Sequence, residues 1–315
     1  MADVVCLGIL VADVFARPVD EWPERGRLSV VPEIGIGLGG CAANTGLSLV
    51  KLGVSTRVMG KVGADGFGTF VTDTLRRGGA DTSGLIVDDQ PGTSATMVMI
   101  DSQGERTFIH SPGANGRLRL EEIDFALATD CRIFHCAGAL VMGDFDGEPM
   151  AECLRRVRAA GVTTSLDTVW NDNSGWMAKL EPCLRHTDIF LPSLAEAQRL
   201  TGEQEPERVA ESLLAYGIGV VGLKMGEQGS YVRTADREIR MPAFRIQAVD
   251  GTGAGDAYVA GFLLGTLQGW DLADTTRFAN AVGALCTTGI GTTAGVRDVA
   301  GTLEFLREQG VQLHS

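Results

Sequence analysis

The strongest constraint on the fold is the alternation of strand-like and helix-like segments along most of the chain. A nearly continuous apolar run over 4–11 predicts a buried strand that ends near Asp13, and 41–52 has the spacing of a helix that stops at Gly53. Repeated alternation predicts an α/β fold with a parallel sheet covered by helices on both faces. Further strands are expected over 56–62, 132–136, 162–167, 188–191 and 218–224, and helices over 67–78, 147–160, 174–185, 194–201, 206–216, 254–268 and 271–288.

Two segments interrupt this rhythm, because both indicate β-structure without helices between them. Alternating residues over 28–36 indicate a strand in segment 14–35, and two strands around the turn at 102–105 predict a hairpin in segment 93–111. The two segments either pair into one small sheet over the mouth of the main sheet, a lid, or add edge strands to the main sheet. The sequence leaves both arrangements open. With 14–35 and 93–111 as the lid, the main domain comprises 1–13, 36–92 and 112–315.

Composition excludes several classes of protein. The 315 residues are 44% hydrophobic and only 21% charged, as expected of a well-buried globular core. The formal net charge of −13 argues against nucleic acid as a partner, because such binding depends on clustered Lys and Arg. An acidic chain can still bind phosphate through a local cradle of backbone N–H groups.

The cysteines and the N-terminus bear on the compartment. The seven cysteines form no CxxC pair and no zinc-like array with the four histidines, so we expect buried free thiols and a reducing compartment. No basic region precedes the first apolar stretch, and the longest apolar run, near 257–267, is too short to span a bilayer. We therefore expect a cytoplasmic enzyme with no membrane partner.

The segment 249–256 is the most informative about chemistry. It reads Val-Asp-Gly-Thr-Gly-Ala-Gly-Asp and leads into an apolar run of helical period. A loop of small residues that becomes a helix N-terminus presents unpaired backbone N–H groups, which attract anions. Asp256 is expected in the first turn, and a carboxylate beside an anion cradle suits phosphoryl transfer to a hydroxyl group. Helix capping by Asp250 alone would need neither the three small residues nor a second Asp.

A second glycine-rich segment opens the helix expected over 41–52. Gly39 and Gly40 allow a ligand to approach the backbone, and Asn44 offers both a donor and an acceptor to a hydroxyl group. Asp13 follows the first strand, where open α/β sheets bind ligands, and its carboxylate can accept two O–H bonds from a vicinal diol. Taken singly, a turn role for Asp13 and a capping role for Asn44 are the better interpretations.

Gly35, Gly37 and Gly40 also match the dinucleotide fingerprint GxGxxG, which would indicate an NAD-dependent oxidoreductase. The match is isolated, because it lies outside the first βαβ unit and Pro32 interrupts the preceding strand. A Walker A motif is absent, since Gly60-Lys61 is followed by Val62. An ATP-dependent enzyme with this sequence would therefore bind its nucleotide without a P-loop.

Together, the two glycine-rich motifs resemble those of the ribokinase-like (PfkB) carbohydrate kinases. Gly39-Gly40-x3-Asn44 and Asp250-x-Thr252-Gly253-Ala254-Gly255-Asp256 match in order and spacing, and the resemblance covers essentially the whole chain. It implies a three-layer α/β/α fold with a mostly parallel central sheet and a small β-sheet lid. It also implies phosphorylation of a hydroxyl of a small sugar or sugar derivative, with ATP, Mg²⁺ and, in many relatives, K⁺.

The resemblance implies a role for each matching residue. Asp256 would be the base that takes the proton of the acceptor hydroxyl, beside an anion hole formed by 253–255, namely Gly253, Ala254 and Gly255. Asp250 and Thr252 would hold a monovalent cation, often potassium, and Glu196 would organise Mg²⁺, usually through water. The implied contacts to the sugar are Asp13, Gly39, Gly40, Asn44, Asn115 and Asp167, and those to the nucleotide are Ser193, Lys224, Gly226, Gly229 and Asn280.

The chain departs from the family pattern at three places. Ser193 replaces the Asn of an Asn-x-x-Glu element, so a phosphate contact is expected to be lost or mediated by water. Gly251 stands where Thr is frequent, which weakens the inference of a cation site. The segment 136–139 lacks the acidic residue with which ribokinases bind sugar, which lowers ribose among the candidates. His110 either reaches the substrate from the lid or is an ordinary surface histidine.

The predicted function is ATP-dependent sugar phosphorylation, with a nucleoside kinase of the same fold as the nearest alternative. The lid segments supply Phe15, Trp22 and Phe108, too few aromatic residues to indicate a nucleobase clamp. An NAD-dependent oxidoreductase is the third and least supported interpretation. No motif identifies the sugar or the oligomeric state. A homodimer through the lid, as in some relatives, is a hypothesis.

Overall fold

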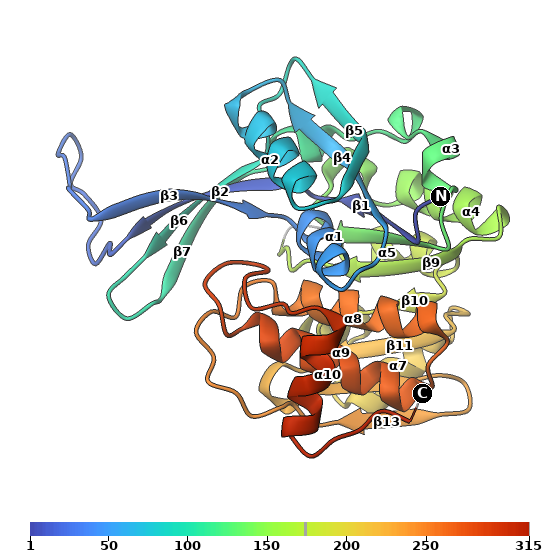
Figure 1. The fold of residues 1–315 in the computed structure, drawn as a ribbon. Helices are drawn as coiled ribbons and strands as arrows, with labels where there is room; N and C mark the ends of the chain where they lie inside the picture. The colour runs from blue at the N-terminus through green and yellow to red at the C-terminus, as the bar shows by residue number, and fades with distance from the viewer. Residues whose placement is uncertain (173–174, 315) are drawn as a thin grey trace.

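The computed structural model describes residues 1–172 and 175–314, and within them the strands form two separate sheets (Figure 1). The larger sheet has the order β13-β12-β11-β10-β9-β8-β1-β4-β5. Its pairing is parallel from β5 to β11 and antiparallel at β11–β12 and β12–β13, so the predicted mostly parallel sheet is confirmed. Its strands are β1 (Val4–Gly8), β4 (Thr56–Gly63), β5 (Asp81–Asp88), β8 (Ile133–Ala139), β9 (Thr163–Thr168), β10 (Ile189–Phe190), β11 (Val220–Lys224), β12 (Ser230–Arg233) and β13 (Glu238–Met241).

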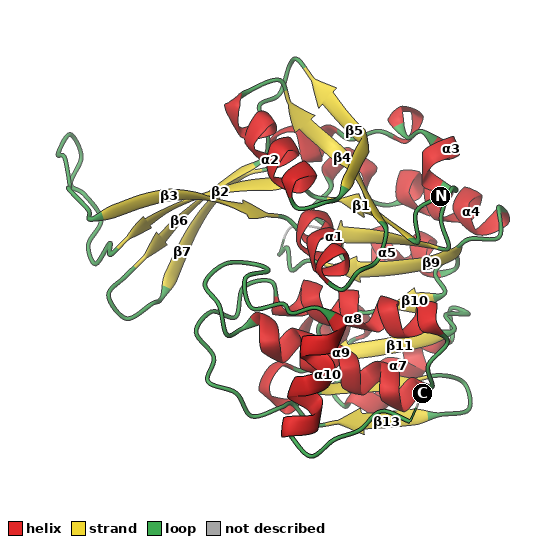
Figure 2. Ribbon diagram, viewed as in Figure 1, coloured by secondary structure: helices red, strands yellow, loops and turns green. Residues whose placement is uncertain are grey.

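Helices cover both faces of the larger sheet and bury two apolar cores, which gives three layers (Figure 2). Successive residues of β1 alternate between these cores, Val4 facing one and Val5 the other. No helix among the described residues is long and apolar enough to cross a membrane. On one face lie α1 (Cys41–Lys51), α2 (Gly66–Arg77), α8 (Ala254–Gln268), α9 (Leu272–Cys286) and α10 (Val299–Glu308); on the other lie α3 (Phe125–Ala128), α4 (Glu148–Ala159), α5 (Met177–Leu184), α6 (Leu194–Thr201) and α7 (Pro206–Leu214).

Helix α8 is buried over most of its length, which fixes the loop in front of it. Residues 257–265 of α8 are buried, because Gly261 and Gly265 let α9 approach closely. A Cβ atom on Gly261 would lie 2.9 Å from Cα of Ala279 in α9. The N-terminus of α8 is therefore held by core packing.

The smaller sheet joins the two β-segments into one element that projects from the body of the protein (Figure 1). Its strands are β2 (Val11–Arg17), β3 (Glu33–Gly39), β6 (Ala95–Ile100) and β7 (Arg106–Ser111). The predicted hairpin joins β6 and β7, and the alternative in which these segments extend the main sheet does not occur. Asp13 pairs with Gly37 and Thr96, and Thr96 pairs with His110, so these four residues share one face of the small sheet.

Among the element boundaries that differ from the sequence-based predictions, two concern β1 and α5. The predicted strand over 4–11 is split, because β1 ends at Gly8 and the chain enters the small sheet at Val11. Ile9 and Leu10 at the bend are also buried, so hydrophobicity alone did not reveal it. Asp13 consequently lies inside β2, and not in a turn after the first strand. The predicted helix over 174–185 begins at Met177, and position 174 lies outside the described residues.

Candidate active site

A cavity of about 990 Å³ opens where the parallel strands β9 and β11 end. Asp167 and Thr168 contribute from the end of β9, and Lys224 from the end of β11. The segment that leads into α8 forms another wall through Gly253, Ala254, Gly255 and Asp256. Carboxyl ends of parallel strands are the usual location of ligands in open α/β sheets.

The N-terminus of α8 is open toward this cavity. Gly253 is the N-cap in a left-handed conformation with φ of 80°, and a Cβ atom there would overlap the carbonyl oxygen of Thr292. No side chain caps α8, so the N–H groups of Gly255 and Asp256 in its first turn have no carbonyl one turn back to bond. Asp250 does not cap the helix but accepts hydrogen bonds from the N–H groups of Thr252 and Gly291, at 2.8 and 3.0 Å. The interpretation of Asp250 as a simple cap is therefore wrong.

Asp256 joins the two glycine-rich motifs. Its Oδ2 accepts a hydrogen bond of 2.9 Å from Nδ2 of Asn44 in α1, 212 residues away in the sequence. Burial raises the pKa of Asp256, and the Asn44 amide and the Lys224 ammonium offset this shift only in part. Oδ1 of Asn44 is buried and has no partner in the protein. Asn44 thus keeps an unused acceptor while its donor orients Asp256.

Gly39 and Gly40 are required by close contacts of the backbone with Asp13 and Ile9. A Cβ atom on Gly39 would overlap Oδ2 of Asp13, and one on Gly40, whose φ is 93°, would overlap the carbonyl oxygen of Ile9. Burial raises the pKa of the Asp13 carboxyl, which a hydrogen bond with Thr96 and the nearby His110 partly offset. Oγ1 of Thr96 lies 3.1 Å from Nδ1 of His110.

Lys224 and Asp167 form an ion pair inside the cavity, with 2.5 Å between Nζ and Oδ2. Burial raises the pKa of Asp167 to about 7, and Lys224 offsets the shift only in part. Burial alone would lower the pKa of Lys224, but Asp167 and Glu196 outweigh it and the net shift is upward. A Cβ atom on Gly255 would lie 3.5 Å from the ammonium, so the Lys224 side chain lies beside the first turn of α8.

Ser193 and Glu196 form a capping box at the start of α6. The Ser193 hydroxyl accepts from the N–H of Glu196, while Oε2 of Glu196 accepts from the N–H of Ser193 at 2.9 Å and from the Thr168 hydroxyl at 3.1 Å. Among residues 1–172 and 175–314, no group of His, Cys, Asp and Glu side chains has the arrangement of a metal site. Any magnesium ion near Glu196 would therefore need ligands from the nucleotide and water.

The turn after β11 and helix α9 shape the wall expected to contact the nucleotide. Gly226 and Gly229 bound this turn with positive φ, and a Cβ atom on Gly229 would overlap the carbonyl oxygen of Met241. Asn280 of α9 lines the cavity, accepts from the Ser230 hydroxyl at 3.0 Å and donates to the carbonyl oxygens of Met241 and Pro242. Asn280 thus fixes the loop after β13.

Asn115, which was expected to contact the sugar, bonds the backbone of Leu10 with both polar atoms of its side chain. Its Oδ1 accepts from the N–H of Leu10 at 3.1 Å, and its Nδ2 donates to the carbonyl oxygen of Leu10 at 2.9 Å. Asn115 is only 3% exposed. This side chain holds the bend between β1 and β2, because Leu10 lies at that bend. Five residues expected to contact the sugar are not among those that line the large cavity: Asp13, Gly39, Gly40, Asn44 and Asn115.

The expected monovalent-cation residues are occupied by an arginine that sequence reasoning missed. Arg106, the first residue of β7, donates from Nη2 to Oδ1 of Asp250 at 2.5 Å and from Nη1 to the Thr252 hydroxyl. Arg106 lies on the same strand face as His110, and this period of two was the signal available in the sequence. Asp250 and Thr252 therefore already have a cationic partner.

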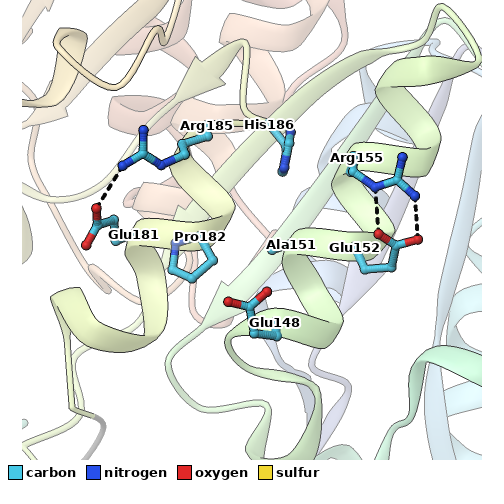
Figure 3. A pocket seen from close by; sticks show the side chains of 8 residues that line it. All are labelled: Glu148, Ala151, Glu152, Arg155, Glu181, Pro182, Arg185 and His186. Atoms are coloured by element: carbon cyan, nitrogen blue, oxygen red, sulfur yellow. Dashed lines mark hydrogen bonds and ion pairs between the residues drawn. The ribbon is translucent and has the colours of Figure 1, made fainter.

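A second, smaller groove lies between α4 and α5 and shares no residue with the large cavity (Figure 3). Its volume is about 360 Å³. Arg155 pairs with Glu152 at 2.6 Å, and Arg185 pairs with Glu181 at 3.0 Å, each within its own helix. Because these charged groups already satisfy one another on an exposed surface, we assign the groove no function.

Comparison with known proteins agrees with this fold. The sequence model of a family described as pfkB family carbohydrate kinase matches residues 1–298. The chain is 30% identical to the 2-dehydro-3-deoxygluconokinase of Bacillus subtilis, over 90% of this chain and 89% of that protein. It is 29% identical to Fructokinase-2 of Oryza sativa subsp. japonica, over 85% of this chain and 84% of that protein.

A solved structure extends the comparison to a nucleotide complex. A putative Ribokinase II from E. coli, in complex with ATP and Mg²⁺, superposes with a TM-score of 0.86 and 25% identity, over 98% of this chain and 100% of that one. The fold is thus that of the ribokinase-like sugar kinases. The chain belongs to the pfkB family of carbohydrate kinases, as its two motifs predicted.

Proposed function

We propose that this carbohydrate kinase transfers the γ-phosphoryl group of MgATP to a hydroxyl group of a neutral sugar, with Asp256 as the base. The observation that carries the proposal is the position of Asp256 in the first turn of the uncapped helix α8, hydrogen-bonded to Asn44. An anion-binding helix terminus and a carboxylate then face the same reacting centre.

In the proposed reaction, the acceptor hydroxyl binds between Asn44 and Asp256. Its oxygen attacks the γ-phosphorus while its proton passes to Asp256, and the bond to the bridging oxygen of the departing ADP breaks. The N–H groups at 253–255 and the Lys224 ammonium stabilise charge on the transferred group. Gly226, Gly229 and Asn280 shape the nucleotide wall, and Ser193 orders Glu196, which would hold Mg²⁺ through water.

The groups around Asp13 favour a neutral sugar over a sugar acid. Thr96 is uncharged, and burial lowers the pKa of His110, an effect that Asp13 offsets in part, so burial disfavours the cationic form of His110. Arg106 is held by Asp250, and Lys224 by Asp167. A substrate carboxylate would therefore meet the Asp13 carboxylate without a compensating cation, which is unfavourable at short range. Two vicinal hydroxyl groups can instead donate to Asp13.

The small sheet has the features of a lid that contacts the sugar with one face and a second copy of the chain with the other. Asp13 and His110 share the inner face, whereas Ile34, Ile36, Met97 and Ile109 lie on the outer face, each at least 42% exposed. We propose that the segments 14–35 and 93–111, with the strand ends that flank them, close over the main domain and that a second copy of the chain covers the apolar face. All seven cysteines are free, which supports a cytoplasmic setting.

The test is ATP consumption by the full chain with a panel of neutral aldoses and ketoses, sugar acids and nucleosides. We expect turnover on a neutral sugar, and loss of kcat by about 10²- to 10⁴-fold in Asp256→Asn with ATP binding retained. Asp236→Asn is the matched control, because Asp236 lies in the exposed turn between β12 and β13. Near-normal turnover by Asp256→Asn would disprove the base, and turnover on nucleosides alone would replace the sugar assignment with a nucleoside kinase.

A further inference from the structure

The contact between Arg106 and the loop at 250–252 links the small sheet to the anion hole. Arg106 lies at the start of β7, while Asp250 and Thr252 come directly before the N-cap of α8. The side chain of Arg106 is 27% exposed and that of Asp250 only 10%, so solvent does not screen this pair fully. The guanidinium contacts the Asp250 carboxylate with one nitrogen and the Thr252 hydroxyl with another.

These partners leave Asp250 poorly suited to a bound potassium ion. Oδ1 of Asp250 already accepts from Arg106 and from the N–H of Thr252, and Oδ2 accepts from the N–H of Gly291. A potassium ion needs oxygen lone pairs that point into an open site, and here two backbone N–H groups and a guanidinium take three of the four lone pairs of the carboxylate. A second positive charge beside the same carboxylate would also be repelled by Arg106. The residues at this position therefore do not fit the cation that the family resemblance implied.

We propose that Arg106 is an internal cation that takes the place of a monovalent metal ion, so that this kinase holds its anion-hole loop through the small sheet and needs no potassium. The inference rests on the proposed kinase function and makes Arg106 a positioning residue, which acts through Asp250 and Thr252. A second contact also connects the small sheet to this loop, since the Thr292 hydroxyl donates to the carbonyl oxygen of Leu38 in β3 at 3.1 Å. Thr292 in turn lies against Gly253, so both contacts tie the sheet that carries Asp13 to the N-cap of α8.

The experiment compares kcat and KM in buffers that contain potassium or tetramethylammonium as the only monovalent cation, for the wild type, Arg106→Gln and Arg106→Lys. We expect the wild-type kcat to be the same in both buffers. Arg106→Gln should lose kcat about 10- to 100-fold without potassium and regain part of it with potassium, because the vacated carboxylate can then bind the ion. Arg106→Lys should keep most of the activity, since an ammonium group can still reach Asp250.

Arg17→Gln is the matched control, because Arg17 is an arginine of the small sheet that pairs with Glu33 of the same sheet. It should retain wild-type rates in both buffers. Activation of the wild type by potassium would overturn the inference, as would an unchanged kcat in Arg106→Gln without potassium.

Thermal melting of the ligand-free protein separates this inference from the proposed function. Potassium should leave the Tm of the wild type unchanged relative to tetramethylammonium and should raise the Tm of Arg106→Gln. A specific rise in the wild-type Tm with potassium would overturn the internal cation even if no sugar is phosphorylated. Absence of turnover on every sugar, with an unchanged wild-type Tm, would reject the kinase proposal alone.

Discussion

Asn44 donates a hydrogen bond from Nδ2 to Oδ2 of Asp256 over 2.9 Å, and this bond joins α1 to the first turn of α8. In the proposed mechanism, one side chain would act on both reacting partners. The amide of Asn44 donates to the Asp256 carboxyl, and its buried, unpaired Oδ1 would accept from the acceptor hydroxyl. The glycine-rich start of α1 and the glycine-rich start of α8 therefore form one site.

Replacement of Asn44 by Ala should move the acid limb of the pH–rate profile to higher pH. A general base works only when ionised, so kcat falls as the pH drops through its pKa. Burial already raises the pKa of Asp256, and loss of the amide removes a group that lowers it. We expect kcat/KM to fall about 10- to 100-fold, the value of a hydrogen bond to a charged group. Thr45→Val is the control, since the Thr45 hydroxyl bonds only the backbone oxygen of Asp256, at 3.4 Å. An equal shift of the acid limb in Thr45→Val would refute the role of Asn44.

Asp250 should contribute stability that is lost in acid. Burial raises the pKa of Asp250, but the N–H groups of Gly291 and Thr252 and the Arg106 guanidinium outweigh it, and the pKa falls from 3.8 to about 2. A pKa that is lower in the folded state gives stability that is present above pH 4 and lost between about pH 4 and pH 2. At pH 6 the free energy of unfolding of the wild type should exceed that of Asp250→Asn by on the order of 1 kcal/mol, after allowance for solvent screening. Urea unfolding at pH 6 and pH 2.5 measures the difference, and a gap that does not narrow in acid would contradict this account.

Asn115→Ala should destabilise the fold and leave the sugar KM nearly unchanged. The substitution leaves the buried N–H and carbonyl oxygen of Leu10 without their partner, at a cost of about 1–3 kcal/mol for each unsatisfied group. Urea unfolding and steady-state kinetics test the two parts separately. Asn115→Asp should also lose stability at neutral pH, because one oxygen of its buried carboxylate would face the carbonyl oxygen of Leu10. A large rise in the sugar KM of Asn115→Ala, with an unchanged free energy of unfolding, would indicate that Asn115 contacts the sugar.

Ile36→Glu should convert the proposed homodimer to a monomer. Ile36 lies on the apolar outer face of the small sheet, and a buried, unpaired carboxylate would oppose association there. Sedimentation at micromolar concentration should give a dimer for the wild type and a monomer for the variant. Val87→Glu is the control, because Val87 is 62% exposed on β5 of the main sheet. A monomeric wild type would dismiss the lid interface.

Local patterns in the sequence predicted most of the strands and helices that position the site. The period of the apolar residues gave α1, α4, α6 and α8 nearly to the residue, because each buries one face or its whole length against the sheet. Strands β5, β12 and β13 and helices α3 and α10 were missed. Strand β3 was placed too early, since Leu28 and Val30 alternate as a strand would but are almost fully exposed. The spacing of apolar residues predicts an element through the face that it buries, so the prediction fails where an apolar residue stays exposed to solvent.

The sequence alone determined the family, the alternation of strand and helix, and the two motifs that contain Asn44 and Asp256, because spacing within a motif is local. Tertiary structure decided what those side chains contact. It directed Asn115 to Leu10 and paired Lys224 with Asp167. It also brought Arg106 of a distant hairpin onto Asp250, across 144 positions of sequence. Such pairings depend on the order of the strands and on how the two sheets are oriented, and no short segment of the chain encodes either.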